Sequence, residues 1–169
     1  RVLRVKYAIV GAGQSGLQFL HACIEKQRGS VGIADERTAI GGHWRDQYSF
    51  VRLHAPKATY GIDTALWTGD KERELASREE ILEHYDLTMN AILQNKAVAC
   101  FLGHSARRVT STTYGPSVLC TPKSASIGTQ PTLLAARGII DATTNALAWN
   151  DPSFLSAPTG TRLMGPAGL

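Results

Sequence analysis

The hydrophobic residues of the first third of the chain predict a strand, a helix and a second strand in succession. Residues 5–10 form a mostly apolar, partly β-branched run that stops at Gly11, as a buried parallel strand does. From Ser15 the apolar positions change to helical spacing, and this pattern ends near Gly29, a residue suited to a left-handed helix C-cap. A second short apolar run covers residues 31–34. We therefore expect a βαβ unit, whose crossover is almost always right-handed.

The middle of the chain predicts a long loop followed by a second helix. Residues 38–68 show no clean period and are rich in aromatic and glycine residues, which is typical of functional loops. Ser77 and Glu80 have the spacing of a capping box, so a helix should begin there. Its apolar stripe is expected at Leu82, Tyr85, Met89, Ile92 and Leu93.

The remaining elements are expected to be strands. Residues 97–102 are typical of a third buried strand, and residues 107–132 form short alternating pieces broken by Gly and Pro, which favours a small antiparallel meander. Residues 132–142 are β-rich and should return to the main sheet at 138–141. The fold class expected is therefore α/β, a Rossmann-like dinucleotide-binding domain with a parallel sheet and a small antiparallel β-meander.

Length and composition place these elements in one domain. The chain has 169 residues, of which 43% are hydrophobic and 19% charged, and this suits one globular domain. We expect the dinucleotide-binding domain to cover residues 1–149 and an irregular tail to cover residues 150–169. Because the sequence begins with Arg and ends without a polar tail, we also expect the rest of a longer parent enzyme to be missing.

Charge and cysteine content exclude several classes of function. The formal net charge is +4, but the basic residues are scattered, so no nucleic-acid partner is expected. The three cysteines fit neither a disulfide framework nor metal-ligand spacing, and no metal is expected. Since no apolar run reaches the length of a transmembrane segment, we expect a cytoplasmic protein.

The strongest chemical signal is GAGQSG at residues 11–16, which places three glycines in G-x-G-x-x-G spacing between a strand and a helix. Gly11 allows the tight turn, Gly13 lets a pyrophosphate approach the backbone, and Gly16 permits close packing of the helix on the strand. The unpaired N–H groups of the first helical turn, with Gln14 and Ser15, then face the phosphates. This context favours a dinucleotide site.

An acidic residue follows the second strand at the position where such sites hold the ribose. Asp35 lies about 20 residues past the last glycine of the motif, where a carboxylate accepts hydrogen bonds from ribose hydroxyls. Glu36 adjoins it, and either acid is a candidate. Arg37 would favour a ribose 2′-phosphate, so an NADP-type ligand stays open as an alternative.

A second glycine pair, Gly41 and Gly42, is followed by Trp44 in the segment GGHW and then by FVRLH at residues 50–54. A domain that bound only NAD has no evident need for this pair. Together with GAGQSG and the acid, these residues resemble the FAD-binding N-terminus of flavin-containing monooxygenase-like NAD(P)/FAD-dependent oxidoreductases. The motifs that carry the resemblance lie within residues 7–62.

The resemblance implies FAD as cofactor, with the first glycine motif at its pyrophosphate, Asp35 at its adenosine ribose and GGHW beside the riboflavin. It also implies that Arg52 and His54 approach the flavin or the substrate, whereas the alternative for Trp44 and His54 is a packed loop anchor. No catalytic residue is nominated, because in flavoenzymes the isoalloxazine performs the redox chemistry. The candidate cofactor-binding residues are Gly11, Gly13, Gln14, Ser15, Gly16, Asp35, Glu36, Gly41, Gly42, Trp44, Arg52 and His54.

Two departures from the family pattern leave the activity open. The family's second G-x-G-x-x-G, which holds NADPH, is absent, so NAD(P)H is expected for the family but has no visible site in this chain. Where many relatives have A-T-G, this chain has Ala142, Thr143 and Thr144. Three interpretations follow: a partial or degenerate FAD domain of an oxidoreductase, a small NAD(P)-binding reductase, or a non-catalytic dinucleotide-binding module. The small-molecule substrate is not indicated.

Overall fold

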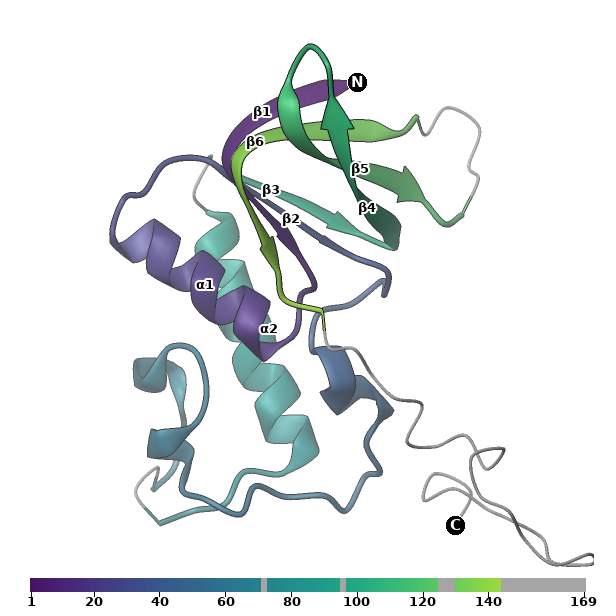
Figure 1. The fold of residues 1–169 in the computed structure, drawn as a ribbon. Helices are drawn as coiled ribbons and strands as arrows, with labels where there is room; N and C mark the ends of the chain where they lie inside the picture. The colour runs from purple at the N-terminus through teal and green to yellow at the C-terminus, as the bar shows by residue number, and fades with distance from the viewer. Residues whose placement is uncertain (71–72, 95–96, 125–129, 144–169) are drawn as a thin grey trace, which may run out of the picture.

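A computed structural model describes residues 1–70, 73–94, 97–124 and 130–143 (Figure 1). Within these ranges one six-stranded sheet has the strand order β3-β2-β1-β6-β5-β4. The pairs β3-β2, β2-β1 and β1-β6 are parallel, and β6-β5 and β5-β4 are antiparallel. The expected α/β class, with a parallel sheet and an antiparallel meander, is confirmed. The strands are β1 (Val2–Val10), β2 (Val31–Asp35), β3 (Val98–Leu102), β4 (His104–Ser111), β5 (Gly115–Pro122) and β6 (Thr132–Asp141).

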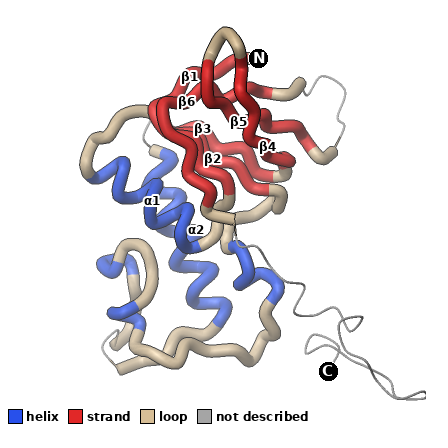
Figure 2. Tube along the Cα trace, viewed as in Figure 1, coloured by secondary structure: helices blue, strands red, loops and turns tan. Residues whose placement is uncertain are grey.

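Two α-helices lie together against one side of the strands, as Figure 2 shows in blue and red. They are α1 (Gln14–Glu25) and α2 (Arg78–Leu93). Between β2 and α2 the chain forms a long loop with three short 3-10 turns, η1 (Gly42–Asp46), η2 (Lys57–Thr59) and η3 (Thr64–Leu66). Neither α-helix of the described ranges is long and apolar enough to cross a membrane.

The parallel strands lie between two hydrophobic cores, which their alternate residues enter. In β1, Tyr7 and Ile9 pack with the helices, whereas Ala8 and Val10 pack with the meander. This is the reason why β1 and β2 are nearly continuous apolar runs instead of alternating ones. Gly32 in β2 leaves room for the side chain of Leu134, because a Cβ on Gly32 would lie only 2.9 Å from Leu134 Cδ1.

Two details of the expected elements are corrected, and a third is not tested. The first helix ends at Glu25, before Gly29, because a Schellman motif closes it: Arg28 N–H donates to Cys23 C=O at 2.8 Å and Gln27 takes the left-handed conformation with φ of 47°. Leu93, in the last turn of α2, is 44% exposed and does not belong to the apolar stripe. The domain boundary expected at residue 149 and the tail lie outside the described residues.

Candidate functional site

The first glycine motif forms the turn from β1 into α1, and two of its glycines are required by the backbone. Gly11 has φ of 102°, a conformation that L side chains rarely adopt. A Cβ on Gly16 would overlap the carbonyl oxygen of Gly11, so the first turn of α1 lies directly against the strand end. The expected roles of Gly11 in the tight turn and of Gly16 in close packing are therefore present in the geometry.

The amino-terminal end of α1 has no side-chain cap, whereas that of α2 is capped by its own side chains. Gly13 is the N-cap of α1 and provides no side-chain hydrogen bond, and the first turn carries Gln14, Ser15 and Gly16 and so no acidic group. In α2, Ser77 and Glu80 form the expected capping box. Uncapped N–H groups and the helix dipole attract negative charge, and the two helices differ in this respect: the first turn of α1 has no side-chain cap beside the glycine turn, whereas that of α2 has one.

The carboxylate of Asp35 ties the end of β2 to the glycine turn. Its Oδ2 accepts a hydrogen bond from Ala12 N–H at 2.6 Å, and its Oδ1 accepts one from Arg37 N–H at 2.8 Å. Asp35 is buried. An ionised carboxylate has about four acceptor positions, so these two bonds leave acceptor capacity for ribose hydroxyls.

The two residues after Asp35 are exposed and each forms an ion pair. Glu36 Oε2 lies 3.1 Å from the Nζ of Lys123, the residue directly after β5. The guanidinium of Arg37 contacts the carboxylate of Asp46, the last residue of η1. Of the two candidate ribose acids, Asp35 is therefore the one that is fixed against the glycine turn.

The second glycine pair contacts the first motif directly. Gly41 N–H donates to Ala12 C=O at 3.0 Å, and a Cβ on Gly42 would lie 2.8 Å from the Cα of Gly13. Both Gly41 and Gly42 have positive φ, at 128° and 55°. The sequence separates these motifs by a helix and a strand, yet the fold brings their backbones into contact. We call the backbone of Gly11, Gly13, Gly41 and Gly42, which carries no side chains, the glycine cradle.

The residues that follow β6 form a third wall of this cradle. A Cβ on Gly11 would lie 2.8 Å from the carbonyl oxygen of Ala142 and 3.2 Å from Thr143 N. The side chain and backbone N–H of Thr143 both donate to Asp141 Oδ1, and these bonds lower the pKa of Asp141 below its ordinary value. Sequence reasoning noted Ala142 and Thr143 only as a departure from a family motif, and it did not place them beside Gly11.

Trp44 is packed into the long loop, and its expected place beside the riboflavin stays a prediction. Its ring is buried, and its Nε1–H donates to the hydroxyl of Tyr60 at 2.7 Å. Arg78, at the start of α2, donates from Nε to the carbonyl of Trp44 at 2.9 Å. The segment after the second glycine pair is thereby fixed to the loop and to α2.

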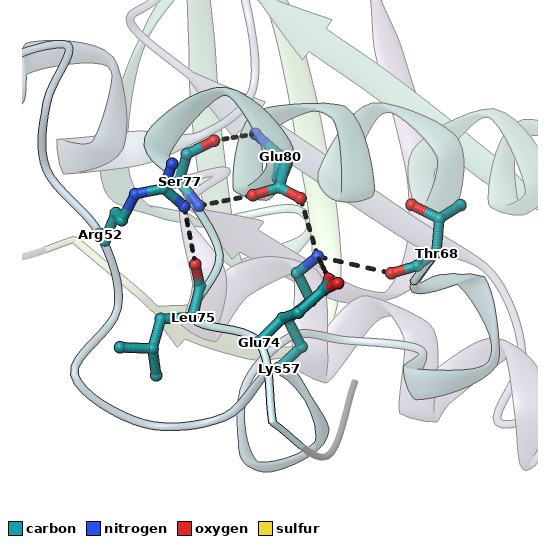
Figure 3. Close-up of polar contacts among 7 residues, drawn as sticks. All are labelled: Arg52, Lys57, Thr68, Glu74, Leu75, Ser77 and Glu80. Atoms are coloured by element: carbon teal, nitrogen blue, oxygen red, sulfur yellow. Dashed lines mark hydrogen bonds and ion pairs between the residues drawn. The ribbon is translucent and has the colours of Figure 1, made fainter. Parts of the chain in front are cut away.

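Arg52 and His54 are exposed, on a segment held by a short antiparallel bridge between Arg52 and Ser77. Arg52 Nη1 donates to Leu75 C=O at 3.1 Å (Figure 3). No contact joins either side chain to the glycine cradle among the described interactions. Their expected approach to flavin or substrate stays a prediction.

Sequence reasoning missed Lys57, which holds the long loop to α2. The side chain is 2% exposed, and its Nζ lies 2.7 Å from both Glu74 Oε2 and Glu80 Oε1 (Figure 3). The hydrogen bond to Glu74 and then that to Glu80 raise the pKa of Lys57, while Lys57 lowers the pKa of both carboxyl groups. No pattern in a single sequence joins a loop lysine to a glutamate already used in a capping box.

His84 of α2 is buried, although a histidine on a helix usually lies at the surface or at its boundary. It is 1% exposed, its ring stacks on Trp67 with centroids 4.0 Å apart, and its Nε2 accepts from Ile62 N–H at 2.9 Å. Burial lowers its pKa to about 4, so the ring is neutral, with its proton on Nδ1. The missed signal was spacing, because His84 lies three residues after Ile81 and four before Thr88, both buried.

With this geometry in place, solved structures identify the fold. The polycyclic ketone monooxygenase from Thermothelomyces thermophila superimposes with a TM-score of 0.65 at 20% identity, over 82% of this chain and 23% of that chain. This chain has the fold of flavin monooxygenases. The flavin-containing monooxygenase from Stenotrophomonas maltophilia gives a TM-score of 0.60 at 22% identity, over 83% of this chain and 38% of that chain. The bacillithiol disulfide reductase from Staphylococcus aureus gives 0.61 at 13% identity, with the same coverage, so the fold is shared beyond the monooxygenases.

Curated proteins also match the sequence, although no protein-family model does. The uncharacterized protein Rv2000 of Mycobacterium tuberculosis is 36% identical over 106 residues, which are 57% of this chain and 19% of that protein. The uncharacterized protein Mb2023 of Mycobacterium bovis matches to the same extent. The chain therefore spans about a fifth of the length of these relatives.

Proposed function

We propose that this chain is the FAD-binding part of a flavin-dependent, NAD(P)H-linked oxidoreductase of the monooxygenase type. The observation that carries the proposal is the contact between Gly13 and Gly42, where two glycine motifs from different parts of the chain form one cradle without side chains. Such a surface lets an extended dinucleotide lie along bare backbone. The likeness to flavin monooxygenase folds supports the same function.

Different residues of the site suit different parts of FAD. The glycine turn and the open N-terminus of α1 suit the pyrophosphate, and the Asp35 carboxylate suits the adenosine ribose. Gly41 and Gly42 would lie along the part of the ligand that leads to the riboflavin, and Trp44 fixes their segment through Tyr60 and α2. When bound, the flavin supplies the redox chemistry, and the residues named here bind and orient it.

Titration of the purified, flavin-free protein with FAD tests the proposal directly. We expect saturable binding, seen as quenched flavin fluorescence and a shifted visible spectrum, at micromolar FAD or below. FMN is the matched control, because it keeps the isoalloxazine and lacks the adenosine diphosphate half. Gly13→Val should abolish FAD binding and keep the circular dichroism spectrum. Equal binding of FMN and FAD, or full FAD binding by Gly13→Val, would contradict the proposal.

We further propose that flavin in this chain reacts slowly with NADPH. The sequence contains one G-x-G-x-x-G motif, and that motif is assigned to FAD. Hydride transfer requires the nicotinamide to be held against the flavin, and such positioning can account for about 7–11 kcal/mol of a barrier. Anaerobic stopped-flow reduction by NADPH should be slow and unsaturable, close to that of free FAD. Saturable, fast bleaching would reveal a nicotinamide site and would favour the reductase interpretation.

A further inference from the structure

We infer that Asp46 contributes to the specificity of the adenosine end of the cradle, because it pairs with Arg37 and so disfavours dinucleotides that carry a ribose 2′-phosphate. The inference rests on the proposed function, since it assumes that Asp35 receives the adenosine ribose. Asp46 lies outside the glycine motifs, at the end of η1. Its consequence is that the flavin site prefers FAD over NADPH, the reductant expected to be present with it.

The first observation is the position of Arg37 beside the ribose acid. Its backbone N–H donates to Asp35 Oδ1 at 2.8 Å, so its Cα is fixed next to the carboxylate. In dinucleotide-binding folds an arginine near this acid accommodates a 2′-phosphate. Here the guanidinium of Arg37 is directed to Asp46 instead, and both side chains are about half exposed, at 45% and 51%.

The second observation concerns the rim of the site, by which we mean the side chains of Asp35, Glu36, Arg37, Asp46 and Lys123. Its second cation, Lys123, is also paired with an acid. Lys123 pairs with Glu36. Its position is set by two backbone hydrogen bonds, from Gly103 N–H to Arg37 C=O at 2.7 Å and from Lys123 N–H to Gly103 C=O at 2.9 Å. The segment after β5 thus places Lys123 beside Glu36, the residue that follows the proposed ribose acid.

The charges of these five side chains decide which ribose fits. Three carboxylates, those of Asp35, Glu36 and Asp46, face two cations, Arg37 and Lys123. A 2′-phosphate carries up to two negative charges and binds best to a free arginine fork. On this rim it would meet an arginine already paired and an excess of negative charge. An unphosphorylated ribose needs only the acceptor oxygens of Asp35, so the rim favours FAD and NAD over NADP.

The size of the effect follows from the exposure of the Arg37–Asp46 pair. An exposed ion pair is weak because solvent and salt screen it. Releasing Arg37 should therefore change the affinity for a 2′-phosphate by about twofold to fivefold. The effect should shrink as the salt concentration rises, because the attraction between charges on this rim is screened.

The test compares NAD+ and NADP+, which differ by the 2′-phosphate alone, as competitors for FAD on the flavin-free protein. The wild type should bind NAD+ more tightly than NADP+. Asp46→Asn should lower the ratio of the NADP+ to the NAD+ dissociation constant by about twofold to fivefold at low salt, while FAD binding changes less than twofold. In the double variant Asp46→Asn with Arg37→Gln the ratio should return to the wild-type value, because the gain in NADP+ affinity comes from the freed arginine. If Asp46 had only a structural role, removing Arg37 would not reverse the change.

Two outcomes would overturn the inference, and they are distinguishable. If FAD binds and Asp46→Asn leaves the NADP+/NAD+ ratio unchanged, Asp46 does not set the specificity and the proposed function stands. If the wild type binds neither FAD, NAD+ nor NADP+, the proposed function fails and the inference fails with it. Glu36→Gln serves as the matched control: a gain for NADP+ in this variant alone would assign the role to Lys123 instead of Arg37.

Discussion

Ala12 and Asp35, 23 positions apart in the sequence, are joined by a 2.6 Å hydrogen bond from the backbone N–H of one to the carboxylate Oδ2 of the other. The residue that we assign to the ribose is therefore also a support of the glycine turn. A substitution there acts on ligand binding and on the turn together, whereas a substitution of its exposed neighbour does not.

Asp35→Ala should weaken FAD binding by at least tenfold and lower the free energy of unfolding by about 2 kcal/mol. A hydrogen bond to a charged group contributes about 1.5–3 kcal/mol, and the variant leaves two backbone N–H groups without their acceptor. Glu36→Ala is the matched control, with an expected change below about threefold in FAD affinity. Calorimetric titration and urea unfolding measure both quantities. Normal FAD binding by Asp35→Ala, with a loss in Glu36→Ala, would make Glu36 the ribose acid.

Alanine at the second and third glycines of the first motif should separate folding from binding. A Cβ on Gly16 overlaps Gly11 C=O, so Gly16→Ala must displace backbone and should cost about 1–3 kcal/mol of unfolding free energy or more. A Cβ on Gly13 lies 3.5 Å from Gly42 Cα, an ordinary contact, so Gly13→Ala should fold normally. Its methyl group would still narrow the cradle, and FAD affinity should fall at least tenfold. Equal thermal stability of the two variants would contradict this account.

Lys57→Met should destabilise the protein although methionine matches the length of the buried stem. Without the ammonium, Glu74 and Glu80 lose the cation between them and the hydrogen bond that it donates to each. Both carboxylates are partly exposed, so water compensates them in part, and the loss should be smaller than for a fully buried ion pair but larger than for an exposed lysine. Lys26→Met, at the exposed end of α1, is the control and should change stability by less than about 0.5 kcal/mol. Urea unfolding at pH 7 gives the comparison, and equal midpoints would refute the role of Lys57.

The burial of His84 predicts that stability falls as the pH drops from about 6.5 to about 4. The pKa of this histidine is about 4 in the fold and near 6.5 when unfolded, so within this window the unfolded chain binds the extra proton. The contribution of neutral His84 to the free energy of unfolding is complete above pH 6.5, and about 3 kcal/mol of it should be lost between pH 6.5 and pH 4. Carboxyl groups with a lowered pKa, such as that of Glu80, reduce the stability mainly at a pH below this range.

Unfolding midpoints measured from pH 4 to pH 7.5 test this assignment. His84→Gln should flatten the dependence between pH 6.5 and pH 4, because its amide does not titrate. His54→Gln removes an exposed histidine and should keep the wild-type slope. If the slope survives in His84→Gln, another group is responsible for it.

The parts of the fold that the sequence predicted are those governed by local patterns. The Ser77 capping box, the buried runs of β1 and β2 and the G-x-G-x-x-G turn each depend on residues close in sequence, and each is present. What was missed depends on contacts between distant segments. Nothing local places Lys57 between two glutamates, and the polar nature of His84 obscured a helical spacing that marked it as buried.

The position of β6 has a consequence for the order of events during synthesis. β6 is the last described strand, yet it pairs with β1, the first, along nearly its whole length, and the residues after it lie against Gly11. A nascent chain therefore exposes the glycine turn long before its third wall leaves the ribosome. Such non-local pairing folds slowly, because the loop must close before the contacts form. We expect the emerging chain to acquire affinity for the dinucleotide in a single late step, when residues up to 143 are free to enter the sheet.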